Sequence, residues 1–214
     1  MRAYDAILFD FDGVLVDSEP VHFACWKEVL APFGITLDWE TYHAHFIGIA
    51  DREMLEKLAQ LRQPPMDLNV LWDEYPRKRA LFRQRMAAGD AVTAEVRNLL
   101  RGLDGYRLAV VSSSGRDEIE TVINAGGIRD CFGALVCRED VAELKPAPEP
   151  YQKAARLLGA QKALVVEDSV AGIASGRAAG FDVLEIPAAR RMPELLRGRL
   201  SAVAPKANRT EPRT

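Results

Sequence analysis

The sequence predicts an α/β protein, a Rossmann-like parallel-sheet core with an all-helical domain inserted after the first strand. From about residue 90 onward, short apolar runs alternate with helical patterns, as in a parallel sheet with right-handed crossovers. Another apolar run, at 6–9, precedes a helical stretch that has no strand candidate of comparable strength. This first strand should therefore join the later sheet. The predicted domains are a core of residues 1–17 and 88–214 and a helical domain of residues 18–87.

The inserted stretch contains four predicted helices. Ser18 and Asp38 are expected to cap the first two helices, and the third and fourth should begin at Asp51 and Asp67. The second helix should break at Gly48, and the fourth should kink or break at Pro76, because proline lacks the amide donor that a helix interior needs.

The core alternates strands and helices. Strands are expected at 108–111, 134–136, 163–166 and 183–186, with helices at 94–100, 118–124, 148–158 and 171–179. Residues 201–214 are polar and contain proline, which predicts a loosely packed extension.

Composition limits the classes of function. Hydrophobic residues make up 48% of the 214 residues and the net charge is −3, so we expect neither a nucleic-acid partner nor a membrane partner. No apolar run approaches the length of a membrane span, and the N-terminus lacks a signal-peptide layout. Cys25, Cys131 and Cys137 show no paired metal-binding spacing and are interpreted as reduced thiols of a cytoplasmic protein. We expect a monomer or a weak dimer.

Polar side chains follow three of the predicted strands. Asp10 and Asp12 end the first, Ser112 follows a later one, and Glu167 and Asp168 follow another. Parallel strands end at one edge of a sheet, so these groups should lie together, where open α/β sheets bind ligands. Alone, the first pair would also fit a solvated acidic turn.

Clustered carboxylates repel one another unless a cation or a shared proton intervenes. Magnesium accepts a few carboxylates together with water and substrate phosphate. Lys145, which precedes a proline-rich connection, adds a charge suited to phosphate. These residues favour phosphoryl transfer to or from a small phosphate ester.

Four segments, in order, resemble the motifs of the haloacid dehalogenase superfamily. They are Asp10-Phe11-Asp12-Gly13-Val14-Leu15-Val16-Asp17-Ser18, Val110-Val111-Ser112-Ser113-Ser114, Lys145-Pro146-Ala147-Pro148 and Val165-Val166-Glu167-Asp168-Ser169-Val170-Ala171-Gly172. The resemblance covers nearly the whole chain. Glu19-Pro20-Val21-His22, Trp26 and the helical insertion resemble the branch of sugar phosphatases, phosphoglycolate phosphatases and β-phosphoglucomutases, in which the insertion is a cap domain.

The resemblance implies a role for each motif residue. Asp10 would be the nucleophile that forms an aspartyl-phosphate, and Asp12 the general acid and base. Ser112 and the backbone amide of Ser113 would hold phosphoryl oxygens, and Lys145 would neutralise charge. Magnesium would be bound by Asp10, the Asp12 backbone carbonyl and Asp168, with Glu167 as a further ligand, directly or through water. True dehalogenases lack the second aspartate and the metal site, so Asp12 and Asp168 argue against dehalogenation.

Other residues are weaker candidates for substrate contact. His22 fits either cap packing or an approach to the active site. Ile47, Gly48 and Arg52 match a cap loop that reaches the substrate in this branch, and a simple turn explains them equally well. Ser114 and Arg116 follow the phosphate-binding serine. Arg116 could bind a second anion or cap the next helix.

The chain departs from the mutases. They carry Lys-Gly in the cap loop where this chain has Ile47-Gly48, and a lysine where it has Gly115. Arg52 is displaced by a residue from the mutase arginine. We therefore expect a Mg²⁺-dependent phosphatase, with a phosphosugar mutase as the alternative. A phospho-accepting regulatory module is a further alternative of another class, disfavoured by the large insertion. Cap hinges are expected at 16–19 and 87–91.

Overall fold

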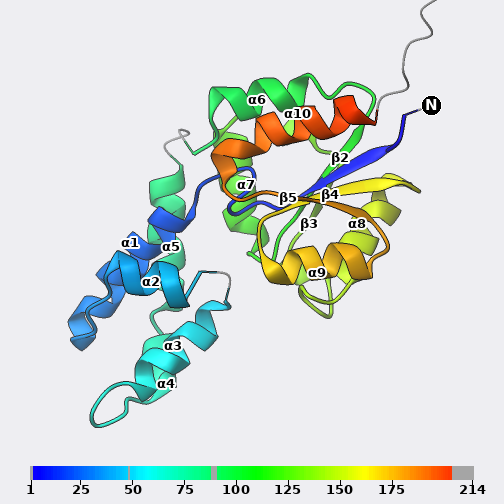
Figure 1. Cartoon of the computed structure of the whole chain (residues 1–214). Helices are drawn as coiled ribbons and strands as arrows, with labels where there is room; N and C mark the ends of the chain where they lie inside the picture. Colours follow the sequence, from blue (N-terminus) through cyan, green and yellow to red (C-terminus); the bar gives the residue numbers. More distant parts are fainter. Residues whose placement is uncertain (1, 48, 88–90, 204–214) are drawn as a thin grey trace, which may run out of the picture.

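The structure, a computed structural model, describes residues 2–47, 49–87 and 91–203 (Figure 1). A sheet flanked by helices forms one part, and a group of helices that follows the first strand lies to one side of it. This arrangement confirms the predicted α/β class with a helical insertion.

The sheet contains five parallel strands in the order β3-β2-β1-β4-β5. Their bounds are β1 Ala6–Phe9, β2 Arg107–Val111, β3 Ala134–Val136, β4 Ala163–Glu167 and β5 Asp182–Glu185. The first strand joins the later ones, as predicted, and the structure places it in the middle of the sheet. Phe9 is in register with Val110 and Val166, so the next residues of all three strands meet at one edge.

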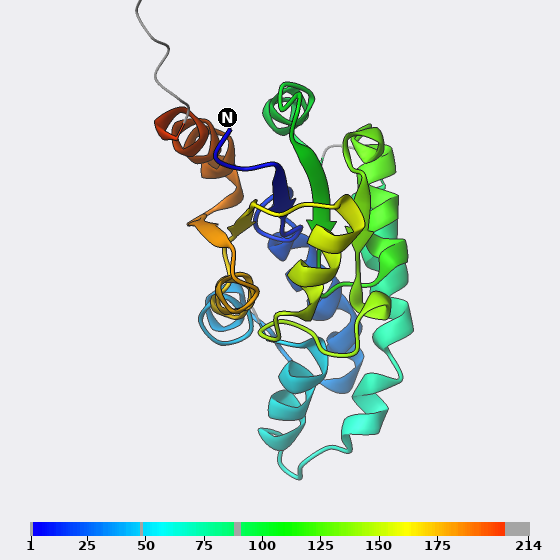
Figure 2. The same ribbon diagram turned by 90° about the vertical axis from the view of Figure 1, so that its right-hand side faces the viewer.

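Helices cover both faces of the sheet (Figures 1 and 2). They are α6 Ala94–Arg101, α7 Arg116–Ala125, α8 Glu149–Leu158, α9 Val170–Ala178 and α10 Met192–Ala202. Ile7 and Phe9 pack in one apolar cluster with α6, α7 and α10, whereas Ala6 and Leu8 pack in another with α8. Alternate residues of β1 therefore serve opposite faces, and all four are fully buried.

The inserted helices have an apolar cluster of their own, which includes Trp26, Leu55 and Leu71. The helices are α1 Glu19–Leu30, α2 Trp39–His45, α3 Asp51–Gln60, α4 Leu68–Trp72 and α5 Tyr75–Met86. The described part of the chain also contains four short 3₁₀ helices, η1 Ala31–Phe33, η2 Arg129–Cys131, η3 Arg138–Asp140 and η4 Ala189–Arg191. The exact domain boundaries stay a prediction, and residues 88–90 of the second predicted hinge lie outside the described residues.

Two expectations about elements need correction. The fourth helix is broken, as was expected near Pro76, but the break between α4 and α5 precedes this residue, which lies in the first turn of α5, where a missing amide donor costs nothing. Residues 201 and 202 end α10 and are not part of an extension, because Met192 and Leu196 anchor this helix in the core. The described helices include none of the length and apolarity that a membrane crossing requires.

Candidate active site

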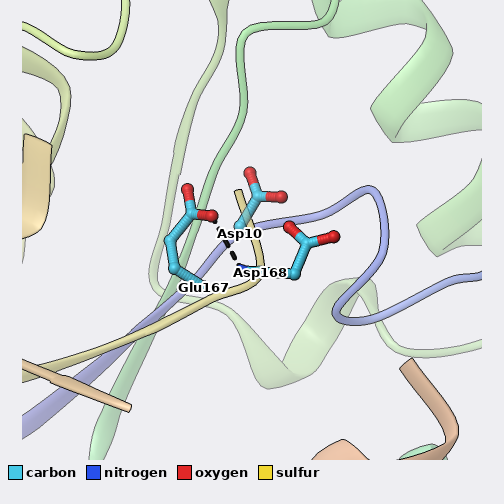
Figure 3. A group of neighbouring side chains, drawn as sticks. All are labelled: Asp10, Glu167 and Asp168. Carbon is cyan, nitrogen blue, oxygen red and sulfur yellow. Dashed lines mark hydrogen bonds between the residues drawn. The ribbon is translucent and has the colours of Figure 1, made fainter. Parts of the chain in front are cut away.

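The candidate site lies where the central strands end. The Asp10 amide donates to the carbonyl of Val166 (2.9 Å), and the Ser112 amide donates to the carbonyl of Val136 (2.9 Å), so each residue just outside its strand is still fixed by the neighbouring strand. Asp10 and Ser112 are buried. Figure 3 shows the side chains of Asp10, Glu167 and Asp168 gathered at the ends of β1 and β4. The predicted convergence of polar groups is confirmed by the strand register.

A tight turn follows Asp10 and closes on Asp168. Gly13 has a φ of 75°, and its amide donates to the carbonyl of Val16 (2.8 Å). A Cβ at this position would lie 1.9 Å from Asp168 Oδ2. Only glycine therefore permits both the left-handed backbone and the close approach of this carboxylate.

Lys145 is the positive centre of the site. Its buried ammonium donates to Asp10 Oδ1 (2.5 Å), Glu167 Oε1 (2.7 Å) and the Val111 carbonyl (2.9 Å). These three bonds use every donor that an ammonium group has. Lys145 is thus held directly against Asp10, and its charge balances at most one of the neighbouring carboxylates.

Glu167 is fully buried and both of its oxygens accept bonds from the protein. Oε1 accepts from Lys145 and from the hydroxyl of Tyr151 (2.8 Å), while Oε2 accepts from the amides of Asp168 (2.9 Å) and Ser169 (3.1 Å) and from the Ser169 hydroxyl. The arrangement suits a carboxylate that orients Lys145 and the loop after β4. It leaves Glu167 poorly placed to contact a cation directly.

The charge of Lys145 compensates Asp10 and Asp168 only in part. Burial raises the pKa of Asp10 well above its ordinary value, because the nearby charges of Glu167 and Asp168 add to it and Lys145 offsets it only in part. Burial and the charge of Glu167 raise the pKa of Asp168 to about 7.

Ligand atoms of Asp10, Glu167 and Asp168 all lie within 4.8 Å of one another. A group of oxygen ligands that is short of positive charge is chemically suited to a hard divalent cation such as Mg²⁺.

Asp12 lies apart from this group and has different neighbours. Its carboxylate accepts from the hydroxyls of Ser18 and Ser114 (3.0 Å for the latter), and His22 Nε2 lies 3.7 Å from it. Burial alone would raise the pKa of Asp12, but His22 and the two hydroxyls outweigh it and lower the pKa. The two aspartates of one turn are therefore electrostatically distinct.

Residues 7–186 match the haloacid dehalogenase-like hydrolase family. The chain belongs to this family. Protein CbbY of Rhodobacter capsulatus is 31% identical over 194 residues, which are 85% of each chain. Fructose-1-phosphate phosphatase YqaB of Escherichia coli is 27% identical and is aligned over 86% of this chain and 96% of its own length. The crystal structure of CbbY from Rhodobacter sphaeroides in complex with phosphate is 26% identical, with a TM-score of 0.71 and 84% of each chain covered.

In this haloacid dehalogenase-like hydrolase, Ser112, Ser113 and Ser114 form a loop beside Asp12. The Ser114 amide donates to Ser112 Oγ (3.0 Å) and its hydroxyl donates to Asp12. Ser113 is exposed, and no hydrogen bond from its amide is found within the part of the chain that the structure describes. This amide is available to a ligand.

The weaker candidates for substrate contact differ in their surroundings. His22 stacks on Phe82 (centroids 4.1 Å apart) and faces Asp12, so it packs between the helical insertion and the site. Arg52 lies over the Trp72 ring, 5.2 Å from its centroid. Arg116 bonds Asp140 (2.6 Å) and pairs with Glu120. Gly48 lies outside the described residues, and Ile47 packs against the apolar cluster of the insertion.

Several residues around the site make contacts that the sequence did not predict. Tyr151 reaches Glu167 from α8, a contact that only tertiary packing reveals. Ser18 was expected to cap α1, but its side chain makes no capping bond and donates to Asp12. Tyr75 and Arg138 join the helical insertion to the serine loop.

Proposed function

We propose that the chain is a Mg²⁺-dependent phosphatase that hydrolyses a small phosphate ester through an aspartyl-phosphate on Asp10. Membership of the hydrolase family and the phosphatases among its relatives support the reaction class. The observation that carries the mechanism is the bond between Lys145 and Asp10, beside the uncompensated carboxylate of Asp168.

In the first step a carboxylate oxygen of Asp10 attacks phosphorus and the bond from phosphorus to the leaving oxygen breaks. Asp12, whose carboxyl is kept protonated by the negative charge of the bound phosphate, gives its proton to that oxygen, and the alcohol departs. In the second step Asp12 takes a proton from water, the water oxygen attacks phosphorus, and Asp10 is released with inorganic phosphate. Splitting the reaction lets each step use a nearby nucleophile, and positioned proton transfer accelerates both.

Charge neutralisation supplies most of what a protein can offer this reaction. The Ser112 hydroxyl and the Ser113 amide would hold the phosphoryl oxygens, while Lys145 balances charge next to Asp10. Asp10, Asp168 and the Asp12 backbone carbonyl would hold Mg²⁺, with Glu167 acting through Lys145 and the loop after β4. Bound Mg²⁺ would neutralise charge on the phosphoryl group.

The leaving group is proposed to be a small alcohol, as in a sugar phosphate. Relatives named fructose-1-phosphate phosphatase and hexitol phosphatase B support this class. Arg52 and Arg116, the two candidates for holding a second phosphate, are engaged with Trp72 and with acidic side chains. Their engagement favours hydrolysis over the mutase alternative. Three free cysteines are consistent with the proposed cytoplasmic setting, and a monomer or weak dimer stays a prediction.

Phosphate release from a panel of esters tests the proposal. The panel should contain fructose 1-phosphate, a hexitol phosphate, phosphoglycolate and p-nitrophenyl phosphate, each assayed with Mg²⁺ and with EDTA. We expect hydrolysis of at least one ester that EDTA abolishes. Hydrolysis that persists in EDTA would contradict the metal assignment, and no release from any ester would contradict the assigned class.

Substitution Asp10→Asn keeps the size of the side chain and removes the nucleophile. We expect the rate of hydrolysis to fall by at least about a thousandfold, because removal of a nucleophile leaves only the contributions of binding and charge. Circular dichroism should show an unchanged fold. Asp5→Asn is the matched control, since Asp5 lies at the opposite end of β1 and binds the amides of Gln161 and Lys162. Comparable activity in Asp10→Asn would refute the nucleophile assignment.

A further inference from the structure

Arg138, the first residue of η3, holds the serine loop from behind. Its Nε donates to the carbonyl of Ser113 (3.1 Å), and its backbone amide donates to the carbonyl of Ser114 (3.1 Å). Two successive carbonyls of the loop are therefore bound by one half-buried residue.

The bond to Ser113 fixes a particular peptide plane. The peptide that joins Ser113 to Ser114 has its oxygen held by Arg138 and its amide held by Ser112 Oγ (3.0 Å). A peptide group is rigid and planar, so restraint at both ends fixes its orientation. The Ser114 side chain leaves from the fixed end and donates to Asp12 (3.0 Å).

The same guanidinium also reaches the helical insertion. Arg138 Nη2 donates to the hydroxyl of Tyr75 (3.1 Å), the first residue of α5. Close by, Arg79 of α5 bonds Glu118 at the start of α7 (2.7 Å). The insertion therefore contacts both Arg138, which binds the serine loop, and α7, which follows that loop.

We propose that Arg138 is a positioning residue for proton transfer, which sets the Asp12 carboxylate through Ser114 while the insertion is docked through Tyr75. This inference rests on the proposed function, because it takes Asp12 as the acid. Among the described residues the hydrogen bonds of Arg138 go to Ser113, Ser114 and Tyr75 and not to Asp10, so its loss should impair protonation of the leaving oxygen more than it impairs attack by Asp10.

Leaving-group dependence distinguishes this role from a structural one. Alkoxide leaving groups need a proton, whereas p-nitrophenolate is stable enough to leave without one. The value of kcat/KM reports the steps up to the first irreversible one, here transfer to Asp10. The probes are p-nitrophenyl phosphate and the alkyl phosphate that the panel above shows to be hydrolysed best.

Arg138→Met keeps the aliphatic part of the side chain and removes the donors. We expect kcat/KM to fall about tenfold for the alkyl phosphate, which is the effect of losing one charged hydrogen bond that assists protonation of the leaving oxygen. For p-nitrophenyl phosphate, which does not need this proton, the fall should be less than about threefold. Arg138→Lys can make one of the two side-chain bonds and should recover part of the loss. Ser114→Ala and Tyr75→Phe, both conservative, should show the same selectivity.

Arg129→Met is the matched control, because Arg129 also donates to a carbonyl, that of Phe132 (3.0 Å), in the loop before β3. It should leave both substrates unaffected. Suppose that Asp12→Asn lowers kcat/KM more for the alkyl phosphate than for p-nitrophenyl phosphate. Equal losses of kcat/KM for the two substrates in the variants of Arg138, Ser114 and Tyr75 would then overturn the inference. If Asp12→Asn also fails to discriminate, the acid assignment falls and the inference falls with it.

Discussion

At the scale of single residues, the site depends on how one lysine is shared. Lys145 bonds Asp10 and Glu167, and Tyr151 bonds the same oxygen of Glu167. Within the described residues no cation is paired with Asp168, and the pKa of its carboxyl is raised to about 7. The metal site therefore depends on Asp168, whose charge Lys145 does not neutralise, as much as on Asp10, which Lys145 contacts.

Stability of the metal-free protein should fall as pH rises. The folded state holds the protons of Asp10 and Asp168 more tightly than the unfolded chain does, since the pKa of each carboxyl is raised. The stabilisation is complete below the unfolded pKa near 4 and is lost as pH rises through about 7 for Asp168. The Tm measured in EDTA between pH 5.5 and 8 tests this prediction. In Asp168→Asn the Tm should fall less steeply with rising pH. A wild-type slope equal to that of Asp168→Asn would contradict the assignment.

Added Mg²⁺ should raise the Tm, and by more at pH 8 than at pH 6, because it competes with protons for the same carboxylates. Asp168→Asn should respond much less. Asp104→Asn changes an exposed aspartate between α6 and β2 and should respond as wild type does. A Mg²⁺ effect that survives in Asp168→Asn would place the cation elsewhere.

Residue positions at the strand ends were predictable, and their partners were not. Asp10, Ser112, Glu167 and Asp168 follow apolar runs, and parallel strands bring such ends together whatever the details of packing. The contacts of Tyr151 depend on how α8 is seated on the sheet, which the spacing of apolar residues does not specify.

At the scale of elements, the inserted helices contain a buried ion pair. Lys78 of α5 is 1% exposed and pairs with Asp51 of α3 (3.2 Å), which also accepts from the indole of Trp26 (2.8 Å). The aromatic rings of Trp26, Tyr75 and Phe82 surround the ammonium group. The pair therefore fixes how α3, α5 and α1 meet.

Removing one partner of this pair should be costly. Asp51→Ala leaves the Lys78 ammonium buried without its carboxylate, and we expect a loss of roughly 3 kcal/mol in the free energy of unfolding. Urea denaturation measures it. Glu53→Ala breaks the exposed pair of Glu53 with Lys57 on the same helix and should cost less than about 0.5 kcal/mol. Equal effects of the two substitutions would show that burial of the Lys78 pair adds nothing.

Element boundaries were predictable wherever capping and periodicity agreed. Asp38 caps α2 by accepting from the Thr41 amide (2.8 Å), as its position predicts. Pro76 was ambiguous, because proline suits both a kink and a first turn, and only the preceding loop decides between them. The helix α10 was missed, although Met192 and Leu196 have helical spacing and are buried.

At the scale of the whole molecule, the helical insertion and the core meet through apolar as well as charged contacts, because Cys25 of α1 and Phe82 and Met86 of α5 pack in the apolar cluster of the core. Arg79 and Arg83 of α5 pair with Asp117 at the start of α7, and Arg138 bonds Tyr75. These contacts join two parts that each have an apolar cluster. The insertion is therefore docked through buried apolar side chains together with these ion pairs.

The insertion itself was predictable from the order of patterns along the chain, because a strand without a neighbour must find its sheet elsewhere. How the insertion docks was not predictable. The arginines of α5 belong to a helix with charges on many sides, and nothing in its pattern marks Asp117 as their partner.

The central claim is that the phosphoryl group passes through Asp10. Acid quenching during turnover of the best ester with Mg²⁺, followed by hydroxylamine treatment and peptide mass spectrometry, tests it most directly. We predict a hydroxamate on the peptide that contains Asp10, at Asp10 itself, and none in Asp10→Asn. A phosphoryl group found on Ser112, or a wild-type peptide that stays unmodified while phosphate is released, would contradict the account.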